Sequence, residues 1–233
     1  MRALFIQQDH VSPTGPVGDA FSDRGYDVVE FNVVSADHYR NPNISVTFPD
    51  PLGFDVIVPM GAPWSVYRDD QIGNWIHDEL ELLRKADRAG VPVFGICFGG
   101  QSLAAAHGGT VQRADEGEIG WTMIEASEEQ IPAGPWFQWH NDTWTLPPGA
   151  IELARNDQAS QAFRLRRNLA LQFHPEITTV QLQEWLDNDG YEYLQEHGID
   201  AEAMLRTTRE VQDQAVVRTR GLVDFFLDQI ATA

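Results

Sequence analysis

The sequence contains very little cysteine, and it lacks any long hydrophobic run. One cysteine, Cys97, among 233 residues excludes an internal disulfide framework and any metal site built from thiolates alone. This cysteine usage is typical of a reducing compartment, so we expect a cytoplasmic protein. No apolar run approaches the ~20 residues that a membrane-spanning helix needs. Segment 1–9 also turns polar too early for a signal peptide. We therefore expect no membrane partner.

Basic residues are scarce as well. Sixteen Lys and Arg, of which only Lys85 is a lysine, stand against 35 Asp and Glu, and the formal net charge is −19. A surface this acidic repels phosphate backbones, so nucleic acids and anionic membranes are excluded as natural partners. Hydrophobic residues make up 42% and charged residues 22% of the chain, which is ordinary for a globular protein and argues against disorder.

Strand-like and helix-like segments alternate in the first half of the chain. Residues 71–89 repeat apolar side chains at helical spacing, with Asp70 as the expected N-cap and Gly90 as the expected stop. Segment 35–52 is rich in Asn and Pro and predicts a long surface loop. Short apolar runs with β-branched residues predict strands at 3–6, 26–31, 55–60 and 91–96. This order predicts an α/β fold with a doubly wound, mostly parallel sheet.

The second half of the chain has a different pattern. Apolar runs divided by turn residues predict antiparallel strands, which extend the sheet or form a small side sheet, at 109–113, 119–125, 136–139, 151–154, 161–165 and 169–173. Thr178 begins a capping box, and an apolar stripe from Met204 to Ile230 predicts a helix packed on the same domain. We expect one domain over 1–187 and a helical C-terminal extension over 188–233.

An acidic segment lies within this half. Residues 168–205 contain eight Asp or Glu and no Lys or Arg. A solvated acidic face is the preferred interpretation, because charge runs usually have that role. The alternative is a docking surface or a lid near the site described next.

The most informative stretch is 95–99, Gly-Ile-Cys-Phe-Gly, which joins an apolar strand to a predicted helix. A glycine two residues before and two after the nucleophile is typical of a nucleophile elbow, where larger side chains would collide with neighbouring backbone. The turn exposes Cys97 at the carboxyl end of the sheet and aims the free N–H groups of the next helix at its sulfur. The alternative, a buried structural cysteine, does not require these flanking glycines.

A base for this thiol is expected at the end of another strand. In the run 171–176, Leu-Gln-Phe-His-Pro-Glu, His174 and Glu176 are separated by one residue, and Pro175 favours an extended backbone that places both on one face. A carboxylate beside an imidazole fixes its tautomer and stabilises the imidazolium.

Together with two further segments, these motifs resemble the class-I, or triad, glutamine amidotransferases. The resemblance spans residues 1 to about 187 and rests on four blocks in the expected order, namely 60–67 (MGAPWSVY), 95–101 (GICFGGQ), 139–149 (WHND followed by LPPG) and 172–176 (QFHPE). It implies a flavodoxin-like core with helices on both faces of the sheet. It also implies hydrolysis of glutamine through a γ-glutamyl thioester, a chemistry that uses neither a cofactor nor a metal ion.

The resemblance also assigns roles to residues. Cys97 corresponds to the nucleophile, His174 to the base and acid, and Glu176 to the residue that orients His174. Ala62 and Phe98 match the backbone N–H donors of the oxyanion hole, with Ala62 in place of the more usual glycine. The residues that match the pocket for the amino-acid end of the substrate are Gln101, Asn141 and Asp142.

One departure from the family pattern concerns the substrate. Gly100 stands where relatives commonly carry His or Met, and we expect it to leave space beside the nucleophile for a γ-glutamyl amide larger than glutamine.

Three functions remain open on the sequence. The first is a glutaminase that supplies ammonia to a separate synthase, since no Walker-type phosphate loop is present. The second is a stand-alone γ-glutamyl peptidase or hydrolase, and the third a non-catalytic regulatory relative. The sequence identifies neither the ammonia acceptor nor the oligomeric state.

Overall fold

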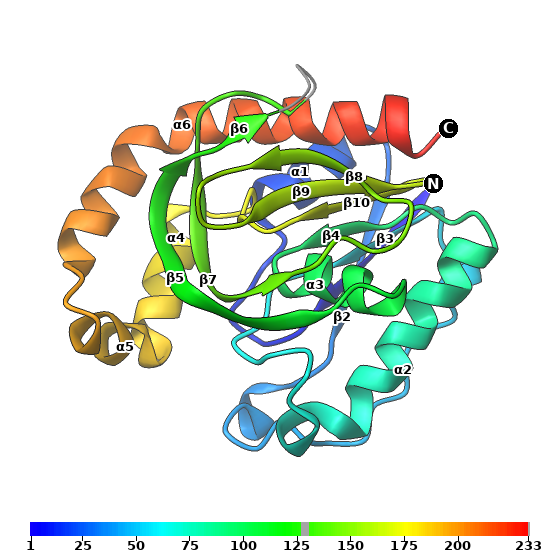
Figure 1. The fold of residues 1–233 in the computed structure, drawn as a ribbon, viewed down its shortest axis with the longest axis horizontal. Coiled ribbons are helices and arrows are strands. Elements are labelled where there is room, and N and C mark those ends of the chain that lie inside the picture. Colours follow the sequence, from blue (N-terminus) through cyan, green and yellow to red (C-terminus); the bar gives the residue numbers. More distant parts are fainter. Residues whose placement is uncertain (127–130, 233) are drawn as a thin grey trace.

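The structure is a computed structural model that describes residues 1–126 and 131–232. Its centre is a parallel sheet in which β1 pairs with β2 on one side and with β3 on the other, and β4 pairs with β10. A parallel bridge between Ile57 and Val93 joins β3 to β4. The bounds are β1 (Arg2–Gln7), β2 (Asp27–Asn32), β3 (Val56–Pro59), β4 (Phe94–Ile96) and β10 (Asn168–Leu171). The predicted parallel sheet is therefore confirmed (Figure 1).

Antiparallel strands continue the sheet beyond β10, in the order β9 (Ser160–Leu165), β8 (Ile151–Arg155) and β6 (Glu125–Ala126). Separately, β5 (Val111–Met123) and β7 (Pro135–Trp144) form the curved two-stranded ribbon at the left of Figure 1. Both expected arrangements of the second half thus occur together.

Two details of that prediction were wrong. Residues 109–113 and 119–125 do not form two separate strands, because β5 runs through both and carries a bulge between Arg113 and Glu118. The polar residues of the bulge look like a turn in the sequence. The other error concerns β10, which pairs antiparallel with β9 but parallel with β4. It is the strand at which the sheet changes direction.

Helices cover both faces of the sheet, as expected. Successive residues of β1 point to opposite faces, so that Leu4 packs with α2 (Asp69–Arg88) and α3 (Phe98–Ala106), whereas Phe5 packs with α1 (Gly15–Asp23) and the C-terminal helix. Helix α2 ends before Gly90, which has φ +76° as expected for a stop. The expected N-cap was wrong: Arg68 occupies that position, and the Asp70 carboxylate binds its guanidinium at 2.7 Å.

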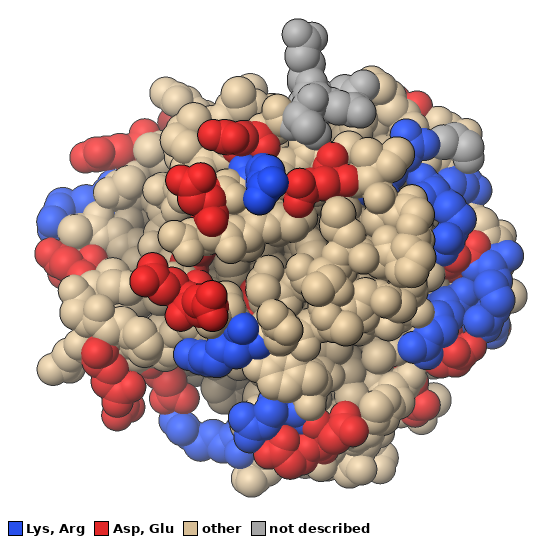
Figure 2. Space-filling view, in the orientation of Figure 1, with Lys and Arg blue, Asp and Glu red and all other residues tan. Residues whose placement is uncertain are grey.

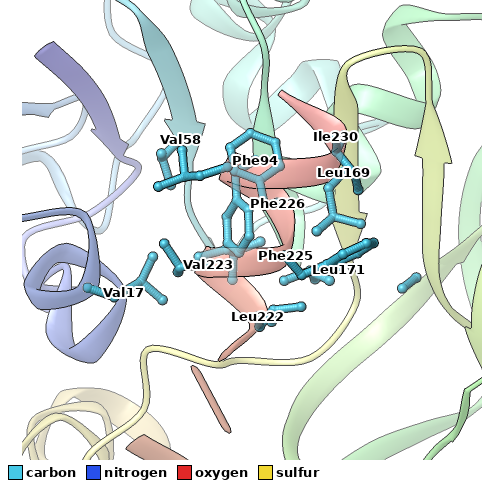
Figure 3. Close-up of a cluster of buried hydrophobic side chains, with 14 of the residues drawn as sticks. Val17, Val58, Phe94, Leu169, Leu171, Leu222, Val223, Phe225, Phe226 and Ile230 are labelled. Carbon is cyan, nitrogen blue, oxygen red and sulfur yellow. The ribbon is translucent and has the colours of Figure 1, made fainter. Parts of the chain in front are cut away.

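The C-terminal region is helical throughout most of its length. Thr178 caps α4 (Thr179–Trp185) by accepting a hydrogen bond from the Gln181 N–H at 3.1 Å. A short turn and α5 (Tyr191–Glu196) lead into α6 (Ala201–Phe225), which crosses the top of the molecule in Figure 1. After α6, the Phe226 ring packs edge-on against Phe94 of β4 at 5.0 Å, within the core cluster drawn in Figure 3. The last helix is therefore part of the main hydrophobic core.

The loop and the surface also follow the sequence. Residues 39–50 contain neither helix nor strand, in line with the predicted loop. Figure 2 shows acidic side chains spread over the face drawn, with many of the Lys and Arg side chains gathered along the edge beside α2. In the part of the chain that the structure describes, no helix is sufficiently long and apolar to cross a membrane.

One carboxyl group of α2 is buried without a basic partner among the residues that the structure describes. Glu79 is fully buried, and its Oε1 accepts a hydrogen bond from Gln8 Nε2 at 2.8 Å. Burial raises the pKa of Glu79 from 4.5 to about 8. Between about pH 4.5 and pH 8, the Glu79 carboxyl is therefore protonated in the folded protein and ionised in the unfolded chain. The resulting loss of stability grows as the pH rises from about 4.5 and is complete above about 8.

We expect Glu79→Gln to stabilise the protein in a pH-dependent way. The amide cannot ionise, so the variant should equal the wild type near pH 4 and exceed its free energy of unfolding by a few kcal/mol, at most roughly 4–5, near pH 9. Urea unfolding at several pH values measures this difference. A difference that does not change with pH would contradict the assignment of the ionisation to Glu79.

Candidate active site

Cys97 lies at a strained turn between β4 and α3. Its φ of 49° and ψ of −106° make it one of three non-glycine residues with positive φ in the part of the chain that is described. A Cβ on Gly95 would lie 2.6 Å from the Gly99 carbonyl oxygen, and a Cβ on Gly99 would lie 2.0 Å from the Pro59 carbonyl oxygen. Both glycines are therefore sterically required, which confirms the reason given for the elbow.

The Cys97 thiol is nearly buried and has polar neighbours. Its Sγ lies 3.8 Å from Gln172 Nε2 and 4.0 Å from the Trp139 carbonyl oxygen. The first N–H groups of α3 have no partner within the helix and begin directly after the cysteine. A thiolate at this position is stabilised by the positive end of the helix dipole.

His174 and Glu176 are in direct contact beside the thiol. Nδ1 of His174 lies 2.7 Å from Glu176 Oε1, and both side chains are buried. The predicted backbone was wrong, because β10 ends at Leu171 and the pair lies in the turn that follows it. The turn is held by the His174 N–H, which donates to the Phe137 carbonyl at 2.8 Å. Since Nδ1 is bound to Glu176, the other ring nitrogen is left for chemistry.

The electrostatics of His174 favour its charged form. Burial alone would lower the pKa of the imidazole, but the negative charges of Glu176 and Cys97 raise that pKa well above its usual value. A protonated His174 is the state that this arrangement stabilises. The imidazolium can donate a proton to a leaving group, and after donation it can accept one.

Gly61 packs closely against both His174 and Cys97. A Cβ on Gly61 would lie 2.9 Å from His174 Cε1 and 3.8 Å from the Cys97 Cβ, so only glycine fits without displacing the imidazole. Ala62 follows it and lines the cavity in front of Cys97. Phe98, the other expected N–H donor, is the first residue of α3, and its side chain packs in the core against Trp75.

The expected binding residues lie together at one end of the cavity. Gln101 Nε2 lies 3.4 Å from the Asp142 carbonyl oxygen, while the Asp142 carboxylate accepts a hydrogen bond from Tyr67 at 3.0 Å. The Asn141 side-chain oxygen accepts one from the Tyr193 hydroxyl at 2.9 Å. Gln101, Asn141 and Asp142 thus each form a hydrogen bond with another residue of the protein.

A single cavity of about 490 Å³ connects the features above. Of the residues proposed from the sequence, Ala62, Cys97, Gln101, Asn141, Asp142 and His174 line it. Glu176 lies behind His174, fully buried. Part of the acidic segment also reaches the cavity, since its wall includes residues between Trp185 and Tyr193. This part of the acidic segment therefore lies beside the site.

A buried polar network behind the cavity was missed on the sequence. Nε2 of His140 lies 3.2 Å from Glu118, and Nδ1 lies 3.1 Å from the Asp142 carbonyl oxygen. Glu118 also accepts hydrogen bonds from Asn156 at 2.5 Å and Gln161 at 2.8 Å. The network thereby supports the segment that carries Asp142. Its members come from four strands or strand ends, and no local spacing relates them.

We expect Glu118→Gln to raise the KM for glutamine about tenfold with a smaller effect on kcat. Loss of one charged hydrogen-bond partner from a buried network costs on the order of 1–2 kcal/mol, and the segment that it supports carries Asn141 and Asp142, which are expected to bind the amino-acid end of the substrate. Steady-state kinetics provide the test, with the exposed Glu116→Gln on the same strand as the control. Equal kinetics for the two variants would remove the positioning role.

The expected effect of Gly100 was wrong. This residue does not line the cavity, and a Cβ at this position would lie 2.7 Å from the Leu171 carbonyl oxygen and 3.2 Å from the Trp144 ring. Gly100 lies on the side of α3 that faces β10, where it allows the helix to approach the strand closely. It creates no room for a larger substrate.

We therefore expect Gly100→Ala to destabilise the protein by about 1–3 kcal/mol, as overpacking against backbone does. Gly100→His should lower the yield of folded protein further. Gly221→Ala is the matched control. Gly221 is a helical glycine with only an ordinary contact at 3.5 Å, so alanine should be neutral or stabilise α6 by up to about 1 kcal/mol. Thermal unfolding midpoints decide, and a neutral Gly100→Ala would contradict the packing argument.

These features define a doubly wound α/β protein with a cysteine at a strand-to-helix turn and a His–Glu pair beside it. The sequence matches the class-I glutamine amidotransferase family over residues 20–192. The chain therefore belongs to the class-I glutamine amidotransferase family.

Similar sequences include the GMP synthases [glutamine-hydrolyzing] of Thermomicrobium roseum and Spiroplasma kunkelii. The Thermomicrobium protein is 37% identical over 136 residues, which cover 54% of this chain and 24% of the relative. The Spiroplasma protein is 32% identical over 142 residues, which cover 57% of this chain and 26% of the relative. The chain thus matches about a quarter of the length of these relatives.

Similar structures cover nearly the whole chain. A glutamine amidotransferase from Thermotoga maritima superimposes with a TM-score of 0.84 at 23% identity, covering 98% of this chain and 99% of that one. A glutamine amidotransferase from Methylobacillus flagellatus gives 0.82 at 24% identity, covering 98% and 95%. At this identity, the likeness supports the fold.

Proposed function

We propose that the chain hydrolyses a γ-glutamyl amide, with glutamine giving glutamate and ammonia, through a thioester on Cys97. The observation that carries this proposal is the placement of Cys97, His174 and Glu176. The thiol stands at the start of α3, and the imidazole beside it has its other nitrogen fixed by a carboxylate at 2.7 Å.

In the first half of the reaction, the Cys97 thiolate attacks the γ-carbonyl carbon and forms a C–S bond. The oxyanion receives hydrogen bonds from the backbone N–H groups of Ala62 and Phe98, each worth a few kcal/mol in such sites. The His174 imidazolium donates its proton to the amide nitrogen. The C–N bond then breaks, ammonia leaves, and the thioester remains.

In the second half, water replaces ammonia. Neutral His174 accepts a proton from the water as its oxygen attacks the thioester carbonyl, and the C–S bond breaks to release glutamate. Glu176 keeps Nδ1 occupied throughout, so that Nε2 carries the transferred proton in both halves. Gln101, Asn141 and Asp142 hold the amino-acid end of the substrate.

Purified protein incubated with glutamine and with γ-glutamyl dipeptides tests the proposal, with ammonia and glutamate measured separately. Hydrolysis of either substrate that depends on Cys97 supports it. A protein that is inert toward both, with and without candidate partners, would instead be a non-catalytic relative.

Two versions of this activity differ in their partner. The relatives are named as glutamine-hydrolysing GMP synthases, and the chain matches about a quarter of their length, which supports a glutaminase that passes ammonia to a separate synthase. The cavity of about 490 Å³ favours the second version, a γ-glutamyl hydrolase that acts on larger amides, because glutamine alone does not fill that volume. Ammonia release that requires an added synthase distinguishes the first version, and cleavage of γ-glutamyl peptides by the chain alone distinguishes the second.

A further inference from the structure

The residues that line the cavity fall into two groups, which we call its first and second compartments. The first contains Gln101, Asn141 and Asp142, of which Gln101 and Asp142 are in contact as described above. The second is lined by a separate set of residues, namely Asp9, Val11, Ser12, Tyr39, Arg40, Trp64 and Asp189. No hydrogen bond or ion pair between described residues links Asp9, Tyr39 or Arg40 to the first set.

Residues of the second compartment contact one another. The Tyr39 ring lies 5.9 Å from Trp64, and Arg40 forms an ion pair with Asp189 at 2.8 Å. Burial raises the pKa of Tyr39 to about 12, with the charges of Asp9 and Asp189 adding to the shift, so its hydroxyl is neutral. These contacts place the loop after β1, the loop after β2 and the turn before α5 around one space.

If the proposed function holds, the leaving group extends toward this second compartment. If the first compartment holds the glutamyl end, the substituent on the amide nitrogen extends from Cys97 past the proton donor, His174. The His174 ring packs against Trp185 at 5.0 Å, and the Trp185 indole N–H donates to the Val11 carbonyl at 3.1 Å. The path past His174 therefore leads to the loop that carries Asp9.

Asp9 is the unusual group in this compartment. Asp9 is 4% exposed, and its Oδ1 accepts a hydrogen bond from the Val11 N–H at 2.9 Å. Among the described residues, no Lys or Arg forms an ion pair with it, and the nearby Arg40 is already paired with Asp189. Burial raises the pKa of Asp9, against the hydrogen bonds from Ser12 and Val11 and the charge of His10. Buried carboxylates are ordinarily paired, so a cation from outside the protein would be stabilised here.

We propose that the second compartment binds the leaving amine of a γ-glutamyl amide that carries a second, positively charged amino group, with Asp9 as its counter-ion. The substrate class is the γ-glutamyl monoamide of an aliphatic diamine. The aromatic rings of Tyr39, Trp64 and Trp185 provide apolar walls for the methylene chain between the two nitrogens. The chemistry is unchanged: the C–N bond breaks, His174 protonates the departing nitrogen, and a diamine leaves in place of ammonia.

The test compares two amides that differ in one group, the γ-glutamyl monoamide of 1,4-diaminobutane and the γ-glutamyl amide of butylamine. We expect the wild type to show a kcat/KM at least tenfold higher for the diaminobutane amide. Asp9→Asn should bring the ratio of the two values close to one. Because both amides are measured on the same variant, the ratio cancels any general loss of activity. The matched control, Asp37→Asn, removes an exposed charge from the nearby loop and should leave the ratio unchanged.

Binding to Cys97→Ala separates this proposal from the proposed function. Calorimetry should show tighter binding of the diaminobutane amide to that inactive variant, and Asp9→Asn introduced into it should remove the difference. Equal affinities and equal kcat/KM values for the two amides would overturn the subsite, even if glutamine is hydrolysed. A protein that hydrolyses none of these amides but binds the diaminobutane amide more tightly would overturn the proposed function and retain the subsite. An unchanged ratio in Asp9→Asn would also overturn the assignment to Asp9.

Discussion

Cys97→Ala is expected to fold normally and to retain no more than ~1% of the wild-type rate of glutamine hydrolysis, because removal of a nucleophile costs several decades in rate. The chain has no other thiol that could replace it. The fold should survive, because Gly95 and Gly99 relieve the collisions at the turn and the Cys97 side chain is small. The unfolding midpoint of the variant verifies this point.

Covalent labelling provides a second measurement on the same variant. A chloroketone analogue of glutamine should modify the wild type once, at Cys97, and should not modify the alanine variant. Cys97→Ser is the closer control, because a hydroxyl preserves the shape of the side chain but is a much weaker nucleophile than a thiolate. Residual turnover well above ~1% in both variants would exclude Cys97 as the nucleophile.

His174→Ala should abolish turnover to a similar degree, whereas Glu176→Gln should lose less. Alanine removes the group that transfers the proton in both halves of the proposed reaction. Glutamine at 176 still offers an oxygen at the position that now lies 2.7 Å from Nδ1, so the imidazole keeps much of its orientation. The three variants should be compared at equal folded fraction, determined from their thermal midpoints.

The pH profile distinguishes orientation from electrostatics at this pair. Glu176 raises the pKa of His174, so the imidazolium persists to higher pH in the wild type than it would without that charge. In Glu176→Gln, the alkaline limb attributed to loss of the imidazolium should therefore move to lower pH. An unchanged limb together with a lowered thermal midpoint would indicate that Glu176 acts only in the fold.

Much of the core of the fold followed from local sequence patterns. The parallel strands, α2 with its stop at Gly90, the Thr178 cap and the turn at Cys97 each depend on residues within a few positions of one another. Apolar periodicity and the glycines of a strained turn are encoded at that range. The four motif blocks also carried the resemblance to the class-I glutamine amidotransferases, and the family match over residues 20–192 agrees with it.

What the sequence could not supply depends on contacts between distant segments. Gly100 looked like free space beside the nucleophile, whereas the order of strands in the sheet places β10 directly against it. The partnership of Glu118 with His140 requires a bulge in β5 that a sequence pattern presents as a turn.

Asp9 shows the same limit most clearly. In the sequence, it is one of 35 acids in a polar segment. Only the tertiary structure shows that it is buried on the wall of the cavity in front of Cys97, with no Lys or Arg among the described residues paired to it, because burial and charge compensation are set by loops that begin at three separate places in the chain. The sequence thus predicted the turn at Cys97 and the candidate reactive groups, and the packing of distant segments decided the shape and charge of the space in front of them.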